Sequence, residues 1–402
     1  MSHERQRRAC YPDHVAVLGG GRWARVVIEV LCGLLPSSVT VSVHSPKNAD
    51  SMLVWARGLG RRIDVSSAWP WFHEHRSIAV IVVAAARDHE AAAKHALSVG
   101  VPVLVEKPIA LTAAAARRLA DLARRRNARF GAAHVFLFAS YLDHFAKRVA
   151  DAGQIRSLRV VWTDPCHEDR YGETKKYDSS LPIVSDILPH VLSMIGKLTP
   201  MRPDHCRIVE LRRGGAAVEL TLMLGEIPCS ILLERDSDQR RRSLAATVEQ
   251  KTLHLEFSKE PGTISDGNTT VAGDPDWEIQ QRPMAQMLTA FLKWVANGEY
   301  DRRLDVDIGL QACDVIDRTM DEYRPAMKSW LRHRLSSMEQ VDDDLRYALT
   351  EILQYEGSLS AADLQGQIDR IQQQLCRTNF QGCGNRKAEI DRLLDFCRAS
   401  SA

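Results

Sequence analysis

The chain lacks any long hydrophobic run. No stretch approaches the roughly 18 consecutive apolar residues that a membrane-spanning helix needs, although 45% of the 402 residues are hydrophobic. Residues 1–10 are polar and basic, without the apolar segment of a secretory signal. We therefore expect a cytoplasmic protein that makes no contact with a membrane.

A strong net charge is also missing. The 53 lysines and arginines nearly balance the 51 aspartates and glutamates, which leaves a net charge of +2. No overall field therefore favours binding to nucleic acid. The 9 cysteines form no Cys-x-x-Cys pair and have no set of histidines beside them, which argues against a disulfide framework and a zinc site. We expect reduced thiols and no bound metal.

The first third of the chain contains alternating strands and helices. A chain of 402 residues is long enough for two domains and an additional segment. Buried strands are predicted at residues 14–18, 39–43, 78–83, 103–106 and 130–134, with helical segments at 26–31, 90–99 and 112–127. This alternation is typical of a doubly wound parallel sheet. We place this α/β dinucleotide-binding domain at residues 12–134.

A glycine-rich turn joins the first strand to the first helix. The turn runs Gly19-Gly20-Gly21-Arg22-Trp23-Ala24. In a Gly-x-Gly-x-x-Ala pattern, the first glycine allows the tight turn, the second lets the backbone approach a pyrophosphate, and the small third residue lets helix and strand pack closely. Free N–H groups at the helix start then face the phosphates. Glycine turns also occur without a ligand, but the flanking strand and helix favour dinucleotide binding.

The second strand ends without the acidic residue that an NAD-specific site places on the ribose hydroxyls. His44, Ser45, Pro46 and Lys47 follow the strand instead. No carboxylate here would repel a 2′-phosphate, and Ser45 and Lys47 are able to hold one. The sequence therefore favours NADP(H) over NAD(H), although a polar loop without any role in cofactor choice has the same composition.

The strand at residues 103–106 leads into Glu106-Lys107-Pro108. In an open α/β sheet, ligands bind beyond the carboxyl ends of the strands, so Lys107 is well placed for chemistry. A surface lysine at a strand-to-loop junction is the alternative, and the strand alone does not distinguish the two.

Asp186 and His190 are four residues apart in a segment that predicts a helix, so their side chains share one face. Ile187 and Val191 are then expected to face the core, and Pro189 to stand in the first turn, where its missing N–H is not needed. An aspartate that orients a histidine is frequent in general acid–base catalysis. The same pair also occurs as a salt bridge or a cap.

From residue 135 the pattern becomes that of an α+β domain, which we place at residues 135–330. Apolar and polar stretches alternate between residues 206 and 272, as in an open antiparallel sheet with one buried face. Arg240, Arg241 and Arg242 are expected in an exposed turn, with anion binding as the alternative. The other expected elements are a helix at 141–152, a strand at 157–162, a polar loop at 164–180, and helices at 284–297 and 307–323, the last of them ended by Pro325.

Residues 331–402 are expected to form a helical C-terminal extension. Leucine and isoleucine recur at helical spacing among many Asp, Arg and Gln residues. The predicted helices cover residues 341–355, 361–376 and 387–397. We expect the extension to pack on the body of the protein or on a partner subunit.

Together, these features resemble the glucose–fructose oxidoreductase, inositol dehydrogenase and rhizopine-catabolism (Gfo/Idh/MocA) family over residues 12–330. The resemblance rests on the glycine turn, on Glu106-Lys107-Pro108 after a strand, and on Asp186-x-x-x-His190, in that order. It implies a Rossmann domain that binds NAD or NADP and a second domain whose open sheet closes the site. Such sheets often mediate oligomerisation, so a homo-oligomer, dimer or tetramer, is expected.

The resemblance also implies roles for individual residues. Lys107, Asp186 and His190 match the family's catalytic residues, and Lys107 and Pro108 are placed against the nicotinamide. The candidate cofactor-binding residues are Gly19, Gly21, Arg22, Trp23, Ala24, Ser45, Lys47, Ala85, His89, Glu106, Lys107 and Pro108. Weaker candidates for holding the substrate are His134, Arg170, Tyr171 and Lys175.

The expected function is hydride transfer between NAD(P)(H) and a hydroxyl or carbonyl carbon of a sugar, cyclitol or related polar metabolite. Hydride transfer to a carbonyl leaves an oxygen that needs a proton. His190 is the candidate for that proton transfer with Asp186 fixing its orientation, and Lys107 is the candidate for stabilising the alkoxide. The alternatives are reduction of a C=N bond on the same fold, and a cofactor-binding regulatory or scaffold protein without turnover.

Overall fold

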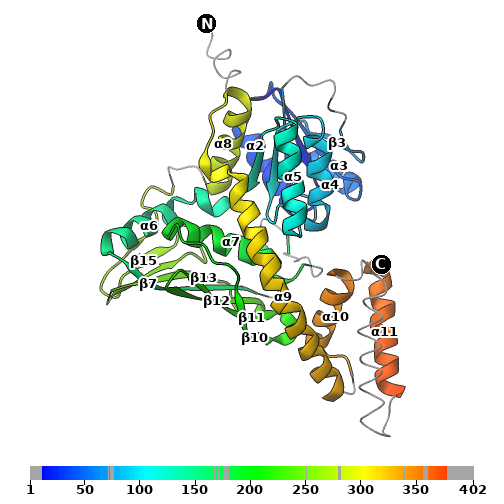
Figure 1. The fold of residues 1–402 in the computed structure, drawn as a ribbon. Coiled ribbons are helices and arrows are strands. Elements are labelled where there is room, and N and C mark those ends of the chain that lie inside the picture. The colour runs from blue at the N-terminus through cyan, green and yellow to red at the C-terminus, as the bar shows by residue number, and fades with distance from the viewer. Residues whose placement is uncertain are drawn as a thin grey trace.

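The computed structural model describes residues 11–70, 72, 77–165, 168–170, 173–174, 181–249, 251–278, 282–337, 340–355 and 361–377. Two domains, each built on its own sheet, lie one above the other, and a long helix runs beside both (Figure 1). The expected fold class is confirmed: a parallel α/β domain is followed by a mostly antiparallel α+β domain and by C-terminal helices.

The N-terminal sheet has six parallel strands in the order β3-β2-β1-β4-β5-β6. They are β1 (His14–Leu18), β2 (Thr40–His44), β3 (Asp64–Ser66), β4 (Ile78–Val82), β5 (Val103–Glu106) and β6 (Phe130–Ala133). This is the strand order of dinucleotide-binding sheets, in which the winding reverses between β1 and β4 and opens a crevice at their carboxyl ends.

Helices cover both faces of this sheet (Figure 1), so its strands are apolar without alternation. One face carries α2 (Arg22–Leu34), α3 (Ala49–Ala56) and α8 (Pro283–Asn297), and the other carries α4 (His89–Leu97) and α5 (Ala113–Arg125). Although α8 comes from the later part of the chain, its Met287 and Phe291 are buried in the core that α2 lines. The N-terminal domain is therefore completed by a helix that lies far along the sequence.

The second sheet has eight strands in the order β10-β11-β12-β7-β13-β14-β15-β16. They are β7 (Ile155–Pro165), β10 (Arg207–Arg212), β11 (Ala217–Leu224), β12 (Ile227–Ser237), β13 (Arg241–Val248), β14 (Lys251–Glu256), β15 (Thr263–Ser265) and β16 (Thr270–Ala272). All neighbours pair antiparallel except β7 and β12, which are parallel. The helices α6 (Ser140–Ala152) and α7 (Ile183–Leu198) contribute to the core on one face of this sheet.

Two expectations for this domain are wrong. The polar loop at 164–180 is interrupted, because β7 continues to Pro165 and a short hairpin of β8 (Asp169–Arg170) and β9 (Glu173–Thr174) follows. The exposed turn at residues 240–242 is also not found as such, since β13 begins at Arg241 and Arg242 is buried, with 3% of its side chain exposed. A buried carboxylate partner, Asp164, makes this burial tolerable.

The long helix is α9 (Val306–Ser337), with 32 residues. The expected end at Pro325 is wrong: Met327 is buried in the core of the second domain, and this packing outweighs the hydrogen bond that the proline removes. Near its start, α9 lies against the N-terminal sheet, because a Cβ on Gly309 would come within 3.0 Å of the Ala132 Cβ. The predicted division at residue 330 falls inside this helix.

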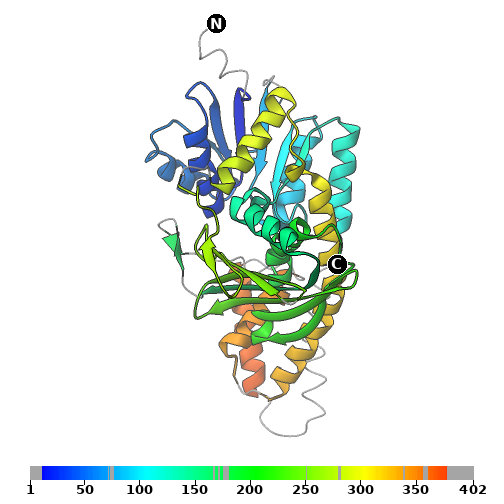
Figure 2. The same ribbon diagram turned by 90° about the vertical axis from the view of Figure 1, so that its left-hand side faces the viewer.

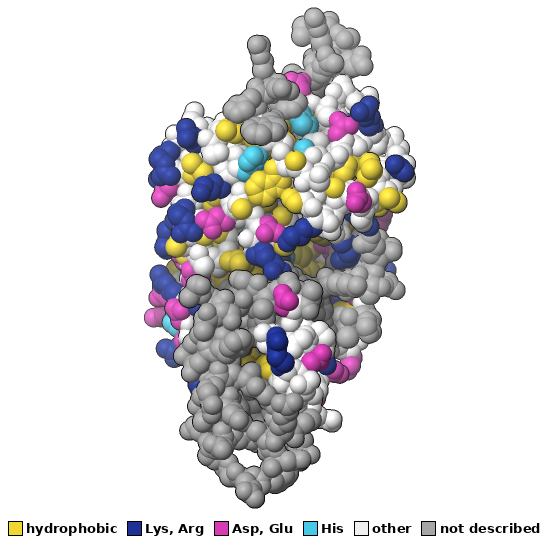
Figure 3. Space-filling model, turned by 90° about the vertical axis from the view of Figure 1, so that its right-hand side faces the viewer, with side chains coloured by type: hydrophobic (Ala, Val, Ile, Leu, Met, Phe, Trp, Pro, Cys, Tyr) yellow, Lys and Arg dark blue, Asp and Glu magenta, His cyan; other side chains and the backbone are white. Residues whose placement is uncertain are grey.

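Two helices follow α9, namely α10 (Asp343–Tyr355) and α11 (Ala361–Arg377), close to the predicted positions. Both lie below the second sheet in Figure 2, on the side away from the N-terminal domain. The helix predicted at 387–397 lies outside the described residues. No helix in the described ranges combines the length and apolar character that crossing a bilayer requires. On the face shown in Figure 3, basic and acidic side chains are interspersed around hydrophobic ones.

Candidate active site

The glycine turn between β1 and α2 has the shape of a phosphate cradle. Gly19 has φ +136°, and a Cβ there would lie 2.5 Å from the Val83 carbonyl oxygen, so only glycine fits. At Gly21 an added Cβ would meet nothing within 4 Å. Gly21 also caps α2, and its first N–H groups receive no side-chain cap. Open space beside free helix N–H groups suits a pyrophosphate. Ala24 is fully buried, as close packing of helix and strand requires.

The last residue of β2 and the residues that follow it have different roles. Ser45 is buried: its Oγ accepts a hydrogen bond from the Asn48 N–H at 3.2 Å and lies 2.5 Å from where a Cβ on Gly20 would be. His44 is held by the Ala68 carbonyl at 2.8 Å and by the Ser42 hydroxyl at 2.9 Å. Lys47 is exposed. Ser45 therefore supports the turn, and Lys47 is the cation at this strand end that is open to a ligand.

Glu106 ties the cradle to the end of β5. It is buried, and its carboxylate accepts hydrogen bonds from the Trp23 side chain and from the Lys107 N–H at 3.1 Å. Burial raises the pKa of Glu106 above its ordinary value, although both donors oppose this. Trp23 and Glu106 thus fix the start of α2 against the end of β5, which Lys107 follows. Arg22 stands beside them in the first turn of α2.

His89 supports the segment that follows Lys107. Its ring lies between two carbonyl oxygens, with Nδ1 2.7 Å from Pro108 and Nε2 3.0 Å from Ala84. Burial lowers the pKa of His89, and a neutral ring has one N–H, so only one of the two contacts is a hydrogen bond at a time. His89 therefore contacts the protein on both sides. Ala85, by contrast, is exposed beyond the carboxyl end of β4.

Lys107 and Asp186 join the two domains. The Lys107 Nζ donates hydrogen bonds to the Asp186 carboxylate at 2.6 Å and to the Asp186 carbonyl at 2.9 Å. Asp186 stands in the first turn of α7, which begins at Ile183. The expectation that Pro189 lies in that first turn is wrong, since it lies inside the helix. Buried apolar neighbours on α7 keep the helix intact there.

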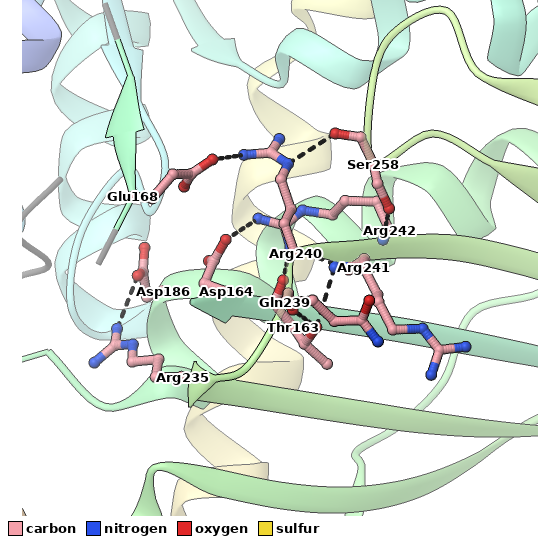
Figure 4. Close-up of polar contacts among 10 residues, drawn as sticks. All are labelled: Thr163, Asp164, Glu168, Asp186, Arg235, Gln239, Arg240, Arg241, Arg242 and Ser258. Carbon is pink, nitrogen blue, oxygen red and sulfur yellow. Dashed lines mark hydrogen bonds and ion pairs between the residues drawn. The ribbon is translucent and has the colours of Figure 1, made fainter. Parts of the chain in front are cut away.

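Asp186 has a second cationic partner that the sequence reasoning missed. The Arg235 Nη2 donates to its other carboxylate oxygen at 2.8 Å (Figure 4), and only 2% of the Arg235 side chain is exposed. Burial alone would raise the pKa of Asp186, but Lys107 and Arg235 outweigh it and hold the pKa well below its ordinary value. A signal was present: Arg235 follows the buried Ile231 and Leu233 at a period of two, which places its side chain inward.

His190 lies on the same helix face but does not contact Asp186 as expected. Both carboxylate oxygens of Asp186 are taken by cations, which attract it more strongly than a neutral ring does. His190 instead stacks on Trp162, with ring centroids 5.5 Å apart and planes within 8°, and meets the edge of Phe136 at 5.1 Å. Burial, and next to it the charge of Lys107, lowers the pKa of His190 well below 6.5, so the imidazole is neutral.

His134 is brought into the same cluster. It is buried, and neither ring nitrogen has a hydrogen-bond partner among the described residues. Burial, reinforced by Lys107, lowers the pKa of His134 to about 4. A positive charge on His134 would also lower the pKa of His190. The hydrogen-bonding capacity of the buried, neutral His134 is therefore not used by any described residue.

A network of arginines and carboxylates lies at the carboxyl end of β7 (Figure 4). The Arg242 guanidinium lies 3.8 Å from the centroid of the Trp162 ring, pairs with Asp164 and donates to the Thr163 carbonyl at 2.6 Å. Arg240 donates to Glu168 at 2.9 Å. Each of these two arginines has a carboxylate partner, so they contribute rigidity. For the other predicted substrate residues, Arg170 belongs to β8, and Tyr171 and Lys175 lie outside the described residues.

Comparison with known proteins supports dinucleotide binding by the N-terminal domain. Residues 14–134 match the sequence model of an oxidoreductase family with an NAD-binding Rossmann fold. No curated protein sequence matches the chain.

Among solved structures, the fold is similar to UDP-N-acetylglucosamine 3-dehydrogenase from Acidithiobacillus ferrooxidans, with TM-score 0.63 and 18% identity over 79% of this chain and 99% of that chain. A 3-ketoreductase from Actinomadura kijaniata, in complex with TDP-benzene and NADP, gives 0.62 and 18% over 77% and 97%. A myo-inositol dehydrogenase from Lactobacillus casei, in complex with NAD(H) and myo-inositol, gives 0.60 and 16% over 77% and 94%.

Proposed function

We propose that this chain, whose residues 14–134 match the Gfo/Idh/MocA oxidoreductase family, reversibly transfers a hydride between NADP(H) and a secondary alcohol or ketone carbon of a sugar or cyclitol ring. The observation that carries the proposal is the ion pair between Lys107 and Asp186. It places an ammonium group beyond the carboxyl end of β5, beside the neutral His190.

The residues present fit a nicotinamide dinucleotide. The open space at Gly21 and the uncapped start of α2 would receive the pyrophosphate. Lys47 would pair with a 2′-phosphate, and no acidic residue follows β2 to repel it. These features support NADP(H) over NAD(H). The nicotinamide, when bound, donates or accepts the hydride.

Three side chains divide the remaining work. Lys107, held at its ammonium group by the carboxylate and the carbonyl of Asp186, donates a hydrogen bond to the substrate oxygen and stabilises negative charge there. His190 is neutral because its pKa is lowered, so during alcohol oxidation it accepts the hydroxyl proton. The rings of Trp162 and Phe136 fix its plane. His134, whose buried ring nitrogens have no partner among the described residues, is the candidate for holding a second hydroxyl of the ring.

The substrate class follows from polarity and from the similar structures. A ring with several hydroxyls would use the two neutral histidines and the lysine as partners. The dehydrogenase and the ketoreductase named above act, by their names, at position 3 of their substrates, and the third protein holds myo-inositol. We propose a ring of this kind as the substrate.

The test is turnover in both directions, followed by NADPH absorbance. The panel contains ketoinositols and 3-keto sugars, free and nucleotide-linked, with the matching alcohols and NADP⁺ for the reverse reaction. Lys107→Ala and His190→Ala should each lower kcat by about 100-fold or more, whereas Lys94→Ala, at an exposed lysine on α4, should match wild type. Equal rates for Lys107→Ala and wild type would overturn the assignment. NADPH binding without any turnover would favour a non-catalytic protein.

A further inference from the structure

Helix α10 is packed into the core of the second domain. Its Leu345, Ala348 and Leu349 are buried in the same core as the sheet. The turn between β10 and β11 admits it closely: a Cβ on Gly214 would lie 2.2 Å from the Asp344 carbonyl oxygen, and Gly214 has φ +62°. The resemblance drawn from the sequence covers residues 12–330, and α10 lies beyond that range.

Tyr347 is the side chain by which α10 contacts the ion-pair cluster. The Arg235 Nη1 donates hydrogen bonds to the Tyr347 hydroxyl and to the Leu181 carbonyl, both at 3.0 Å. The Arg235 Nη2 donates to Asp186, which in turn accepts from Lys107. A chain of three hydrogen bonds therefore leads from α10, through a buried guanidinium, to Lys107.

The geometry of the guanidinium gives this chain its effect. Its donors form a flat, rigid fork, so fixing Nη1 at two acceptors fixes the direction of Nη2. Nη2 then sets the orientation of the Asp186 carboxylate, whose other oxygen holds the Lys107 ammonium. With 2% of the Arg235 side chain exposed, water has little access to replace a lost acceptor.

We propose that Tyr347 is a positioning residue of the active site, which acts through Arg235 and Asp186 to aim Lys107 at the substrate oxygen. The proposal rests on the role of Lys107 in the proposed function. The C-terminal extension then supports the catalytic site through Arg235, without contacting the substrate. A change in how α10 is seated is then transmitted to the reacting centre.

Tyr347→Phe is the test variant, and Tyr323→Phe is its matched control. The Tyr323 hydroxyl donates to Glu351 of α10 at 2.8 Å, so the control removes a buried hydroxyl that joins α10 to α9, whereas the Tyr347 hydroxyl joins α10 to Arg235 of β12. Tyr347→Phe should lower kcat about tenfold, equivalent to about 1.4 kcal/mol, with KM within about twofold of wild type. Tyr323→Phe should change both by less than about twofold, whatever its melting temperature.

A second readout needs neither substrate nor cofactor. Reductive methylation at neutral pH, quantified by mass spectrometry, gives the labelling rate of Lys107 relative to the exposed Lys94. An ammonium group held by a carboxylate reacts slowly, so Tyr347→Phe should raise this ratio several-fold, and Tyr323→Phe should leave it near the wild-type value.

Equal labelling ratios and equal kcat values in the two variants would show that the hydroxyl serves packing alone, and the proposal would fall. If wild type turns over no substrate, the proposed function fails, while the labelling ratio still decides whether Tyr347 positions Lys107.

Discussion

The replacement Asp186→Asn removes the one charge that both Lys107 and Arg235 share. Asparagine keeps the shape of the side chain but leaves the buried guanidinium without its counter-charge. Breaking a buried ion pair from one side costs about 3–5 kcal/mol. Because 23% of the Asp186 side chain and 15% of the Lys107 side chain are exposed, solvent screens part of this, and we expect a loss of about 3 kcal/mol in the free energy of unfolding.

The pH dependence of this loss has a definite sign. The neighbouring cations hold the pKa of Asp186 well below its ordinary value, so its stabilisation is fully present above the unfolded-state pKa of about 3.9 and is lost as the pH falls through the folded-state value. The difference between wild type and Asp186→Asn should therefore stay constant from pH 8 to pH 5. It should shrink only below about pH 4.

The assay is urea unfolding followed by circular dichroism, with midpoints and slopes compared across this pH range. Asp143→Asn is the matched control, since Asp143 pairs with Lys197 of the same helix, α7, but 44% of its side chain is exposed. A surface pair of this kind is worth about 0.2–1 kcal/mol. Equal losses in the two variants, or a difference that grows from pH 8 to pH 5, would refute the reasoning.

Three further predictions concern the cofactor cradle and the proton acceptor. Gly19→Ala should lower the free energy of unfolding by about 1–3 kcal/mol, because Gly19 has φ +136° and an added Cβ would clash with the Val83 carbonyl oxygen. Gly21→Ala should leave the melting temperature unchanged and weaken NADPH binding, measured by calorimetry, about tenfold. Lys47→Glu should weaken NADPH binding about 10-fold to 100-fold and leave NADH binding nearly unchanged in the same measurement, and equal effects on both would contradict its pairing with a 2′-phosphate. Since burial and Lys107 lower the pKa of His190, the acid limb of the kcat/KM profile for alcohol oxidation should lie well below pH 6.5, and a limb at or above that value would exclude His190 as the proton acceptor.

Much of the fold is predictable from the sequence because its strands are continuous apolar runs next to glycines. The strand β3 and the helix α3 are missed since both lie at the outer edge of the first sheet, where β3 has no fully buried residue and Leu53 and Val54 of α3 are exposed. Pro189 and Pro325 mislead the assignment of helix ends, because buried neighbours on α7 and α9 keep each helix intact. Tertiary packing decides these cases, and no local pattern records it.

The sequence predicts which residues belong to the candidate site, but not all of the contacts between them. Lys107 and Asp186 are 79 residues apart in sequence, and the structure brings them into contact. The contact between Asp186 and His190 is predicted from helical spacing and is not made, because Arg235 competes for the carboxylate from a strand of another part of the chain. Electrostatic competition between residues far apart in the sequence depends on the fold, so the spacing of a motif does not predict it.

The single helix α9 has a thermodynamic consequence. Its first half is bound to the N-terminal domain, where Asp317 accepts the Ala113 N–H at 2.7 Å, and its second half is buried in the other domain. Neither domain can unfold without freeing part of a helix that the other needs, so the two should melt as one cooperative unit. A ligand of the N-terminal domain that is present at a hundred times its Kd stabilises the folded state by about 2.7 kcal/mol, and through α9 this stabilisation extends to the second domain.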